Sequence, residues 1–355
     1  MNLKIIKNSK PKEKPDFSDA KKLGFGKIFS DHMFVMDYLK NKGWHNARIV
    51  PYGKFEIEPS ISVLHYGQSA WEGLKAYKTD DNNILLFRPE KNFERLNNSM
   101  NRLEIPKIDE NFCLEALKKL ILIDKEWVPN FPQTSLYIRP IAISTDTEIR
   151  LKSSENYKFL IICSPSGNYN DLAPNKIIVE EKYVRAAPGG TGFAKTPGNY
   201  AATLTSQKIA NEKGYSQVLW LEAIERKYIE EVGSMNIFFK ISGEIITPAL
   251  NGSILPGITR MSVIEILKDW EIPVSERKIS IEEIYKAYKN ETLEECFGSG
   301  TAAVITSVGE LSWQDKKIIV NENKIGSLTK KLYDEITGIQ YGKIKDKFNW
   351  TMNIS

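Results

Sequence analysis

Residues 189–202 read Gly-Gly-Thr-Gly-Phe-Ala-Lys-Thr-Pro-Gly-Asn-Tyr-Ala-Ala, and this stretch is the most informative part of the chain. Lys195 stands alone between a glycine cluster and a Pro-Gly-Asn-Tyr turn, just ahead of a helical pattern. Loop glycines let the backbone approach a ligand closely, and a lone lysine there is a candidate nucleophile. Taken alone, Lys195 could equally be a solvated surface charge. Its meaning depends on the segments that follow.

The composition is that of an ordinary globular protein. The chain has 355 residues, enough for two domains or one large one, with 41% hydrophobic and 26% charged residues. Its 49 basic and 45 acidic side chains are scattered, and no apolar run approaches the roughly 18 residues of a membrane span. We therefore expect neither a nucleic-acid nor a membrane partner. The N-terminal stretch lacks the apolar core of a signal peptide, which favours a cytoplasmic location.

The cysteines and histidines show no spacing typical of a metal-binding site. The three cysteines are far apart and odd in number, which argues against a disulfide framework, and the three histidines have no ligand spacing. We expect a protein without a metal.

Strand-like and helical patterns are mixed along the chain, which predicts an α+β fold. Strands are expected at 34–36, 63–66, 84–87, 135–139, 157–163, 176–179, 217–221, 235–240 and 244–247. Helices are expected at 93–103, 109–127 (capped by Asp109), 199–213, from 259, from 280 (with a Ser280–Glu283 capping box) and at 327–341. Turn residues gather between 164 and 174, so we place an N-terminal domain at 1–165, a linker at 166–175 and a C-terminal domain at 176–355.

Three further segments of the second half contain residues that could bind a ligand or take part in catalysis. Glu231 opens an otherwise apolar strand beside a small-residue turn; it is costly to bury unless paired, and could instead be a charge at the rim. Leu-Pro-Gly at 255–257 precedes a helix start, which is either an ordinary capped helix or an anion site suited to phosphate. Gly-Ser-Gly-Thr at 298–301 offers backbone N–H groups and hydroxyls for a phosphate or carboxylate. Together with Lys195, these are the groups that pyridoxal phosphate requires.

The sequence resembles the branched-chain aminotransferases among the type IV pyridoxal-phosphate enzymes. The matching blocks run in order from 25 to 342: Phe-Gly-Lys-Ile-Phe-Ser-Asp-His-Met at 25–33, His-Tyr at 65–66, Trp-Glu-Gly-Leu-Lys-Ala-Tyr at 71–77, Leu-Phe-Arg-Pro at 86–89, Leu-Tyr-Ile-Arg-Pro at 136–140, Glu-Val-Gly-Ser-Met-Asn-Ile-Phe at 231–238, Leu-Pro-Gly at 255–257, Phe-Gly-Ser-Gly-Thr-Ala at 297–302 and Gln-Tyr-Gly at 340–342. The resemblance implies a two-domain fold with a smaller N-terminal α/β domain and a larger, barrel-like C-terminal domain that binds the cofactor.

The resemblance also implies roles for individual residues. Lys195 would bind the cofactor covalently and carry a proton. The other cofactor contacts would be Arg95, Ile258, Thr259 and Thr301 at the phosphate, Tyr200 at the phenolic oxygen and Glu231 at the pyridine nitrogen. The substrate would meet Thr301 and Ala302 at its α-carboxylate, Tyr66 from a partner subunit of a homodimer, the pocket residues Phe25, Trp71, Tyr137 and Tyr169, and Arg139 at the distal carboxylate of glutamate.

The expected reaction exchanges the amino group between leucine, isoleucine or valine and 2-oxoglutarate. Trp71 and Tyr137 could instead be plain core aromatics. A D-amino-acid aminotransferase or an aminodeoxychorismate lyase of the same fold is the alternative enzyme, and a non-catalytic anion-binding protein is the alternative of another class. Some animal relatives carry a Cys-x-x-Cys pair after the Gly-Thr-Ala turn; Ala303 and Thr306 stand there in this chain, so we expect no redox switch at that place.

Overall fold

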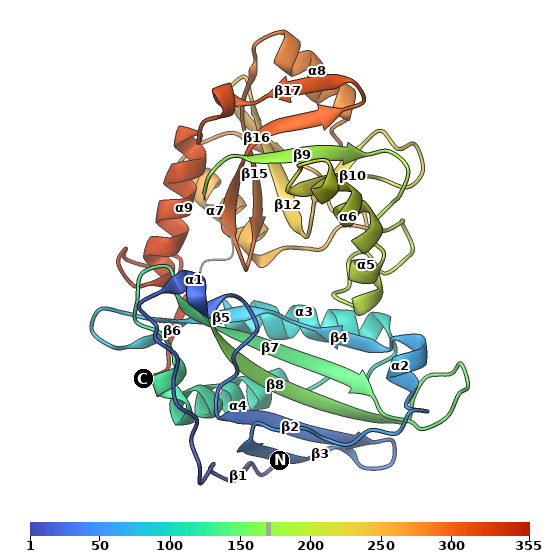
Figure 1. The fold of residues 1–355 in the computed structure, drawn as a ribbon, viewed down its shortest axis with the longest axis vertical. Coiled ribbons are helices and arrows are strands. Elements are labelled where there is room, and N and C mark those ends of the chain that lie inside the picture. The colour runs from blue at the N-terminus through green and yellow to red at the C-terminus, as the bar shows by residue number, and fades with distance from the viewer. Residues whose placement is uncertain (168–171) are drawn as a thin grey trace. The chain divides into compact units, whose positions relative to one another are not determined.

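The computed structural model describes residues 1–167 and 172–355, which fold as two compact units (Figure 1). Unit 1 comprises Met1–Tyr169, Ala194–Pro197 and Gly338–Ser355, and unit 2 comprises Asn170–Phe193 and Gly198–Thr337. The predicted linker at 166–175 includes residues 168–171, which lie outside the described residues. The division into domains at 1–165 and 176–355 therefore stays a proposal.

Unit 1 is built on a nine-stranded sheet with the order β1-β3-β2-β8-β7-β5-β6-β18, in which β4 also pairs with β7. Its pairings are antiparallel except for that of β1 with β3. The strands are β1 (Lys4–Ile5), β2 (His32–Leu39), β3 (Gly43–Pro51), β4 (Ser69–Trp71), β5 (Leu74–Lys78), β6 (Ile84–Phe87), β7 (Ser135–Ser144), β8 (Asn156–Ser166) and β18 (Thr351–Asn353).

The central strand β7 shows how this sheet separates a core from a second face. Leu136, Ile138 and Ala142 point into the main hydrophobic core, which also contains apolar residues of the helices α3 (Pro89–Arg102) and α4 (Glu110–Ile123). Because side chains alternate along a strand, Tyr137 and Arg139 stand on the opposite face. The predicted cap of α4 is confirmed: the Asp109 side chain accepts a hydrogen bond from Phe112 N at 3.0 Å.

The remaining helical segments of unit 1 are α1 (Ala20–Leu23), α2 (Ser62–Tyr66) and the 3₁₀ turn η1 (Lys125–Trp127). The predicted strand at 63–66 is wrong, because these residues form α2. Gly67 adopts a left-handed conformation with φ 62°, and its N–H donates to Val63 O at 3.1 Å, which closes a helical turn. A run of four apolar and aromatic residues does not distinguish a strand from a single turn of helix.

Unit 2 contains a sheet that closes into a six-stranded ring. The order is β11-β10-β9-β16-β15-β12, and β12 pairs in turn with β11. Figure 1 shows β9, β10, β12, β15 and β16 gathered side by side, and apolar residues of the ring form a second hydrophobic core. The predicted mixed α/β, barrel-like fold is thus confirmed. The strands are β9 (Asn175–Glu180), β10 (Gln217–Leu221), β11 (Ile229–Val232), β12 (Met235–Ile241), β13 (Glu244–Thr247), β14 (Val274–Glu276), β15 (Leu293–Gly300), β16 (Val304–Trp313) and β17 (Lys316–Ile319).

The helical segments of the second half are α5 (Pro197–Ala201), α6 (Leu204–Glu212), α7 (Ile258–Asp269), α8 (Ile281–Lys289), η2 (Asn321–Asn323) and α9 (Ser327–Gln340). The single helix predicted at 199–213 is two helices, since the Thr203 hydroxyl bonds to Tyr200 O at 2.7 Å and competes with the helical backbone there. The predicted cap of α8 is confirmed by the bond from Glu283 N to Ser280 Oγ at 3.0 Å. Within the described part of the chain, no helix has the length and apolarity needed to cross a membrane.

Candidate active site

The backbone of Lys195 is fixed by two strong contacts within unit 1. Its N–H donates to Ser99 Oγ at 2.9 Å, and its carbonyl accepts from Trp71 N at 3.1 Å. Ser99 belongs to α3 and Trp71 to β4, so the lysine is anchored to both a helix and a strand of this unit. The glycine-rich loop before it therefore ends at a defined place.

The side chain of Lys195 lies in an unusual electrostatic setting. Its Nζ is 4.1 Å from the centroid of the Trp71 ring. The pKa of Lys195 is lowered to about 8, chiefly by the loss of water around the ammonium and also by the nearby Arg95, while the carboxylate of Glu72 opposes the shift. A lysine with such a pKa is neutral often enough near neutral pH to attack a carbonyl and to carry a proton.

Arg95, the predicted phosphate ligand, is held by a buried carboxylate. Its Nε and one terminal nitrogen donate to the two oxygens of Glu72 at 2.7 and 2.9 Å, and Glu72 is fully buried. Glu72 also accepts from Asn92 Nδ2 at 2.8 Å and from Gly73 N at 3.0 Å. Burial opposes ionisation of this carboxyl, but Arg95 and Lys195 hold its pKa below the usual value. Glu72 had no predicted role; its place within the matching block 71–77 was the available signal.

Four predicted pocket residues come together on the second face of the unit 1 sheet. Arg139 donates to Tyr137 Oη at 2.9 Å, and its guanidinium carbon lies 4.0 Å from the Trp71 ring centroid. Phe25 meets Tyr137 edge-on, with ring centroids 4.6 Å apart. Tyr137 in turn lies over the backbone of Gly73, where an added Cβ would come within 2.1 Å of its hydroxyl. The result is an aromatic surface that carries a guanidinium.

One other predicted substrate contact, Tyr66, stands apart from this group. Tyr66 ends α2 and is 40% exposed, with the imidazole of His65 as its recorded aromatic neighbour. Tyr169 lies outside the described residues.

In unit 2, Glu231 is buried in β11 and paired. Its Oε1 accepts from Leu255 N at 2.8 Å, and its Oε2 lies 3.2 Å from Nε of Arg185, which is also buried. The neighbouring Glu230 is buried as well, but it binds Ser253 and Asn251 instead. The condition set by the sequence, that a buried Glu231 needs a partner, is met by Arg185. Sequence reasoning missed this arginine, which is 46 residues away and lies in no recognisable motif.

The predicted phosphate turn leads directly into α7. Ile258 and Thr259 are the first residues of this helix, whose N-terminal N–H groups have no partner within the helix itself. Asn236 of β12 donates to Leu255 O at 2.9 Å and thereby holds the turn. Gly257 is required at the N-cap, because an added Cβ would come within 2.0 Å of the Asn236 side-chain oxygen.

The other predicted anion turn, with Thr301 and Ala302, connects β15 to β16 and is half-buried. Nearby, Ser299 Oγ and Thr306 Oγ1 are buried and have no hydrogen-bond partner within the described residues. Ser299 is also the register partner of Asn236, so Asn236 adjoins both anion turns of unit 2. Buried hydroxyls without a protein partner are typical of a site that receives a polar ligand.

Tyr200, the predicted partner of a phenolic oxygen, lies half-buried in the short helix α5. The preceding residue, Asn199, exchanges two hydrogen bonds with Thr191 at 2.7 and 2.8 Å. These bonds tie the glycine-rich loop to the start of α5 and set the position of Tyr200.

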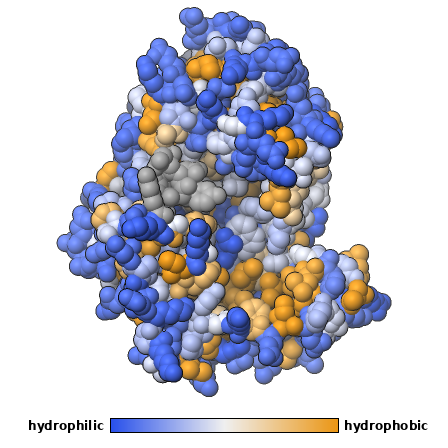
Figure 2. Space-filling view, in the orientation of Figure 1, coloured by the Kyte–Doolittle hydropathy of each residue, from blue (hydrophilic) through white to orange (hydrophobic). Residues whose placement is uncertain are grey.

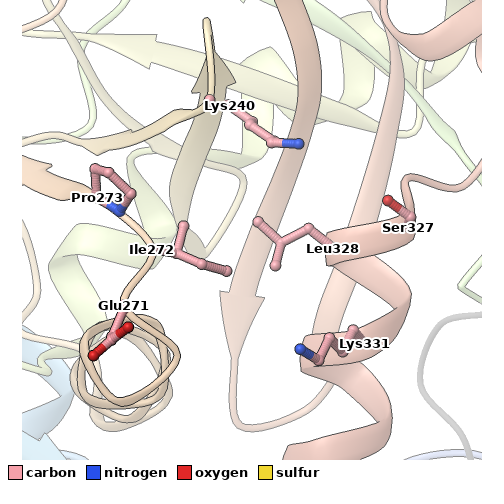
Figure 3. Close-up of a pocket in the computed structure, with 8 residues that line it drawn as sticks. Lys240, Glu271, Ile272, Pro273, Ser327, Leu328 and Lys331 are labelled. Atoms are coloured by element: carbon pink, nitrogen blue, oxygen red, sulfur yellow. The ribbon is translucent and has the colours of Figure 1, made fainter.

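A cavity of about 430 Å³ in unit 2 is unrelated to these residues. Figure 3 shows Ile272 and Leu328 pointing toward one another across it. Its two lysines are engaged elsewhere: Lys240 Nζ lies 2.6 Å from Glu294, and Lys331 Nζ lies 3.8 Å from the Trp270 ring centroid. None of the predicted site residues lines this cavity.

Comparison with known proteins agrees with this geometry. Residues 69–311 match the family described as amino-transferase class IV. The chain belongs to the class IV aminotransferases. It is 56% identical to branched-chain-amino-acid aminotransferase 2 of Bacillus subtilis, over all of this chain and 97% of the relative. Crystal structures of branched-chain aminotransferases from Thermoproteus uzoniensis and Escherichia coli match with TM-scores of 0.77 and 0.76 at 26% and 27% identity, covering 91% and 92% of this chain and 100% and 99% of theirs.

Class IV aminotransferases use pyridoxal phosphate, and each unit, taken by itself, holds groups whose chemistry suits this cofactor. Unit 1 supplies Lys195, with its lowered pKa, and an arginine. Unit 2 supplies the buried Glu231 carboxylate, a helix N-terminus without a side-chain cap in the described structure, and the two unpartnered hydroxyls near Thr301. An aldehyde, a pyridine nitrogen and a phosphate each find a chemically suitable group among these residues.

Proposed function

We propose that this protein is a branched-chain amino acid aminotransferase. It transfers the amino group reversibly between L-leucine, L-isoleucine or L-valine and 2-oxoglutarate, giving the branched 2-oxo acids and L-glutamate. The observation that carries the proposal is Lys195, whose pKa is about 8, set against the Trp71–Arg139 surface. The class IV family match and the 56% identity to the Bacillus subtilis aminotransferase support it.

The chain's own residues divide the catalytic work. When bound, pyridoxal phosphate supplies an aldehyde for the amino group and a ring that withdraws electrons from the substrate Cα. Lys195 Nζ would take the proton from the substrate Cα and deliver it to C4′ of the cofactor, a role typically worth about 10²–10⁴ in rate. The Glu231 carboxylate favours the protonated form of the ring nitrogen.

Two further sets of residues would bind the cofactor phosphate and the α-carboxylate of the substrate. Arg95 and the N–H groups of Ile258 and Thr259 bind the phosphate, as a guanidinium and a helix N-terminus do well. The N–H groups of Thr301 and Ala302 bind the substrate α-carboxylate. Tyr200 would donate a hydrogen bond to the phenolic oxygen of the cofactor.

The pocket must accept both an aliphatic side chain and a carboxylate. Phe25, Trp71 and Tyr137 offer apolar ring surface to leucine, isoleucine and valine. Arg139, stacked on one of these rings and bonded to the hydroxyl of another, offers charge to the distal carboxylate of glutamate.

An amino-acid panel with 2-oxoglutarate as the acceptor tests the function. We expect turnover of the three branched substrates, with modest differences because one methylene in an apolar pocket is worth about 1–3 kcal/mol. L-Aspartate and D-alanine should react little. Faster turnover of D-alanine than of L-leucine would favour the D-amino-acid aminotransferase of the same fold.

We also propose a homodimer in which Tyr66 reaches the partner's site. Leu64 and Tyr66 of α2 are 62% and 40% exposed. Figure 2 shows apolar residues gathered over β7 and β8 toward α2. Exposed apolar patches of this kind mark protein interfaces. Full activity in a sample shown to be monomeric by sedimentation would contradict the dimer. The three free, buried cysteines fit a reducing cytoplasm, which we propose as the location.

A further inference from the structure

The N-terminal segment 8–14, which we call the strap, is bonded to the loop at 24–31 of unit 1. The backbone N–H of Lys12 donates to Oδ1 of Asp31 at 2.8 Å. The ammonium of the same lysine donates to two backbone carbonyls of the loop, each at 3.1 Å, which belong to Phe29 and Ser30. One residue of the strap therefore contacts three consecutive residues of the loop.

Asn8, at the start of the strap, is bonded to a buried histidine. Its N–H donates to Nε2 of His32 at 2.8 Å, so this ring nitrogen is an acceptor and the ring proton lies on Nδ1. Nδ1 lies 2.6 Å from Oδ1 of Asp124, and the other oxygen of this carboxylate accepts from His32 N at 2.9 Å. Because Asp124 follows the last residue of α4, the imidazole is held between the strap and that helix.

The carboxylate that accepts from the backbone of Lys12 is itself fixed. Trp127 Nε1 donates to Oδ2 of Asp31 at 2.9 Å, and the carbonyl of Asp31 accepts from Tyr52 N at 2.8 Å. Burial opposes ionisation of this carboxyl, but the bonds from Lys12 and Trp127 hold the pKa of Asp31 below its usual value. Asp31 is therefore charged at neutral pH and gives the strap a stationary acceptor.

The loop has a backbone anchor at each end. At the first, Gly24 O accepts from Gly167 N at 3.2 Å, and at the second, Ser30 N donates to Cys163 O at 2.9 Å. The ammonium of Lys12 binds the carbonyl of Ser30, so the strap reinforces the second anchor.

Phe25 lies between these anchors, on a stretch of backbone that its neighbours do little to fix. Gly24 and Gly26 flank it with φ of 59° and 65°, a conformation that glycine adopts readily among many others. The Phe25 ring meets Tyr137 edge-on, with ring centroids 4.6 Å apart. Because the glycines leave the chain free to turn, the position of this ring depends on the anchors of the loop.

We propose that Lys12 is a positioning residue that holds the loop and so keeps Phe25 against Tyr137, where the branched side chain of the substrate would bind. The inference rests on the proposed function, because that function makes Phe25 part of the substrate pocket. Lys12 acts through the loop rather than on the substrate. Its loss should therefore weaken the binding of a long aliphatic side chain and leave the proton transfer at Lys195 unchanged.

The kinetic test compares two amino acids that differ in the length of the side chain. Lys12→Met removes the ammonium and keeps a side chain of similar length. The Michaelis constant and kcat are measured for L-leucine and for L-2-aminobutyrate, whose short side chain offers less surface to the Phe25 ring. We expect the Michaelis constant for leucine to rise about three- to tenfold with kcat retained, the size of effect that the loss of a hydrogen bond can have. The constant for 2-aminobutyrate should change less.

Hydrogen–deuterium exchange of the full-length protein gives a readout that does not depend on activity. Exchange in the peptide that spans 24–31, followed by mass spectrometry, should become faster in Lys12→Met, because local opening is easier when an anchor is weakened. Exchange in β7 should stay the same. A general loss of stability in unit 1 would speed the exchange in both peptides.

Matched variants separate the strap contact from a general effect of charge. Lys10→Met is the control, because Lys10 is exposed and, in the described part of the chain, is bonded only through its backbone N–H, to Asn8 Oδ1. Lys12→Arg keeps a cationic donor and should preserve both the exchange rate and the preference for leucine. Unchanged exchange at 24–31, or an equal rise in both Michaelis constants, would overturn the inference. Failure of the wild-type enzyme to transaminate leucine would instead overturn the proposed function, and the exchange comparison would still test the strap.

Discussion

The guanidinium of Arg139 stacks on the ring of Trp71, with its carbon 4.0 Å from the ring centroid. The same ring is 4.1 Å from Lys195 Nζ, so one tryptophan adjoins both the amine proposed to bind the cofactor and the cation proposed to bind the distal carboxylate. A cation over an aromatic face is worth about 0.5–2 kcal/mol, depending on how far it is desolvated. Trp71 thereby helps to set the positions of both cationic groups.

Gly73→Ala should displace Tyr137, the tyrosine that accepts a hydrogen bond from Arg139. The new Cβ would come within 2.1 Å of the Tyr137 hydroxyl, so the tyrosine must move and its 2.9 Å bond to Arg139 must weaken. We expect a loss of about 1–3 kcal/mol in the free energy of unfolding, typical of overpacking, and a higher Michaelis constant for 2-oxoglutarate.

A double-mutant cycle with Tyr137→Phe checks the cause. Removing the hydroxyl first should make Gly73→Ala markedly less costly, because the clashing atom is gone. Strictly additive losses in urea unfolding would show that the contact is not responsible.

Uptake of pyridoxal phosphate by the apoenzyme should depend on pH through Lys195. The pKa of this lysine is about 8 rather than the usual 10.5, and only the neutral amine attacks an aldehyde. The rate of uptake at Lys195 should therefore be low below pH 8, rise through it and level off above. A stopped-flow absorbance series gives the midpoint, and the Lys195→Ala variant gives the background from other lysines. A midpoint near 10.5 would contradict the assigned environment.

Glu72→Gln should affect both stability and the pKa of Lys195. The substitution leaves Arg95 buried without its counter-charge, which in similar cases costs about 3–5 kcal/mol. Because the Glu72 carboxylate raises the pKa of Lys195, its loss should move the midpoint of cofactor uptake to lower pH. Glu94→Gln, on the same helix, is the control: its pair with Lys91 is exposed and should matter by less than about 1 kcal/mol. A midpoint that stays in place or rises would count against the link between Glu72 and Lys195.

Glu231→Gln and Glu230→Gln should have different effects on the loss of the substrate Cα proton. Both carboxylates are buried, but they bind different partners, Leu255 N and Arg185 for one and Ser253 and Asn251 for the other. With Glu231→Gln, cofactor should still bind while loss of the Cα proton slows about 10- to 1,000-fold, since an opposite charge moves a pKa by about 1–3 units. Exchange of the Cα proton of leucine with solvent deuterium measures this step. If only Glu230→Gln slows the exchange, the assignment is off by one residue.

Local patterns in the sequence predicted much of the fold. Asp109 and Ser280 were recognised as helix caps because each cap needs only a short polar residue a few positions from its N–H partner. The strand predicted at 135–139 is confirmed as part of β7. The helical turn at 62–66 was not predicted, because four apolar and aromatic residues fit either a strand or a turn, and the left-handed Gly67 decides the outcome.

The sequence predicted individual residues of the candidate site but not the partners that hold them. Lys195, Glu231 and the two anion turns stand in short motifs, but their surroundings depend on partners distant in sequence. Glu72 holds Arg95 from 23 residues away, and Arg185 holds Glu231 from 46 residues away. No local pattern encodes such pairs, because they are set by the packing of whole elements and by the cost of burying an unpaired charge.

The central claim is that Lys195 is the lysine that binds the cofactor. Reduction of the holoenzyme with borohydride, digestion and mass spectrometry of the peptides test it most directly. The account predicts a single phosphopyridoxyl addition on the peptide that contains Lys195, which disappears in Lys195→Ala. An addition on another lysine, or no stable addition at all, would contradict it.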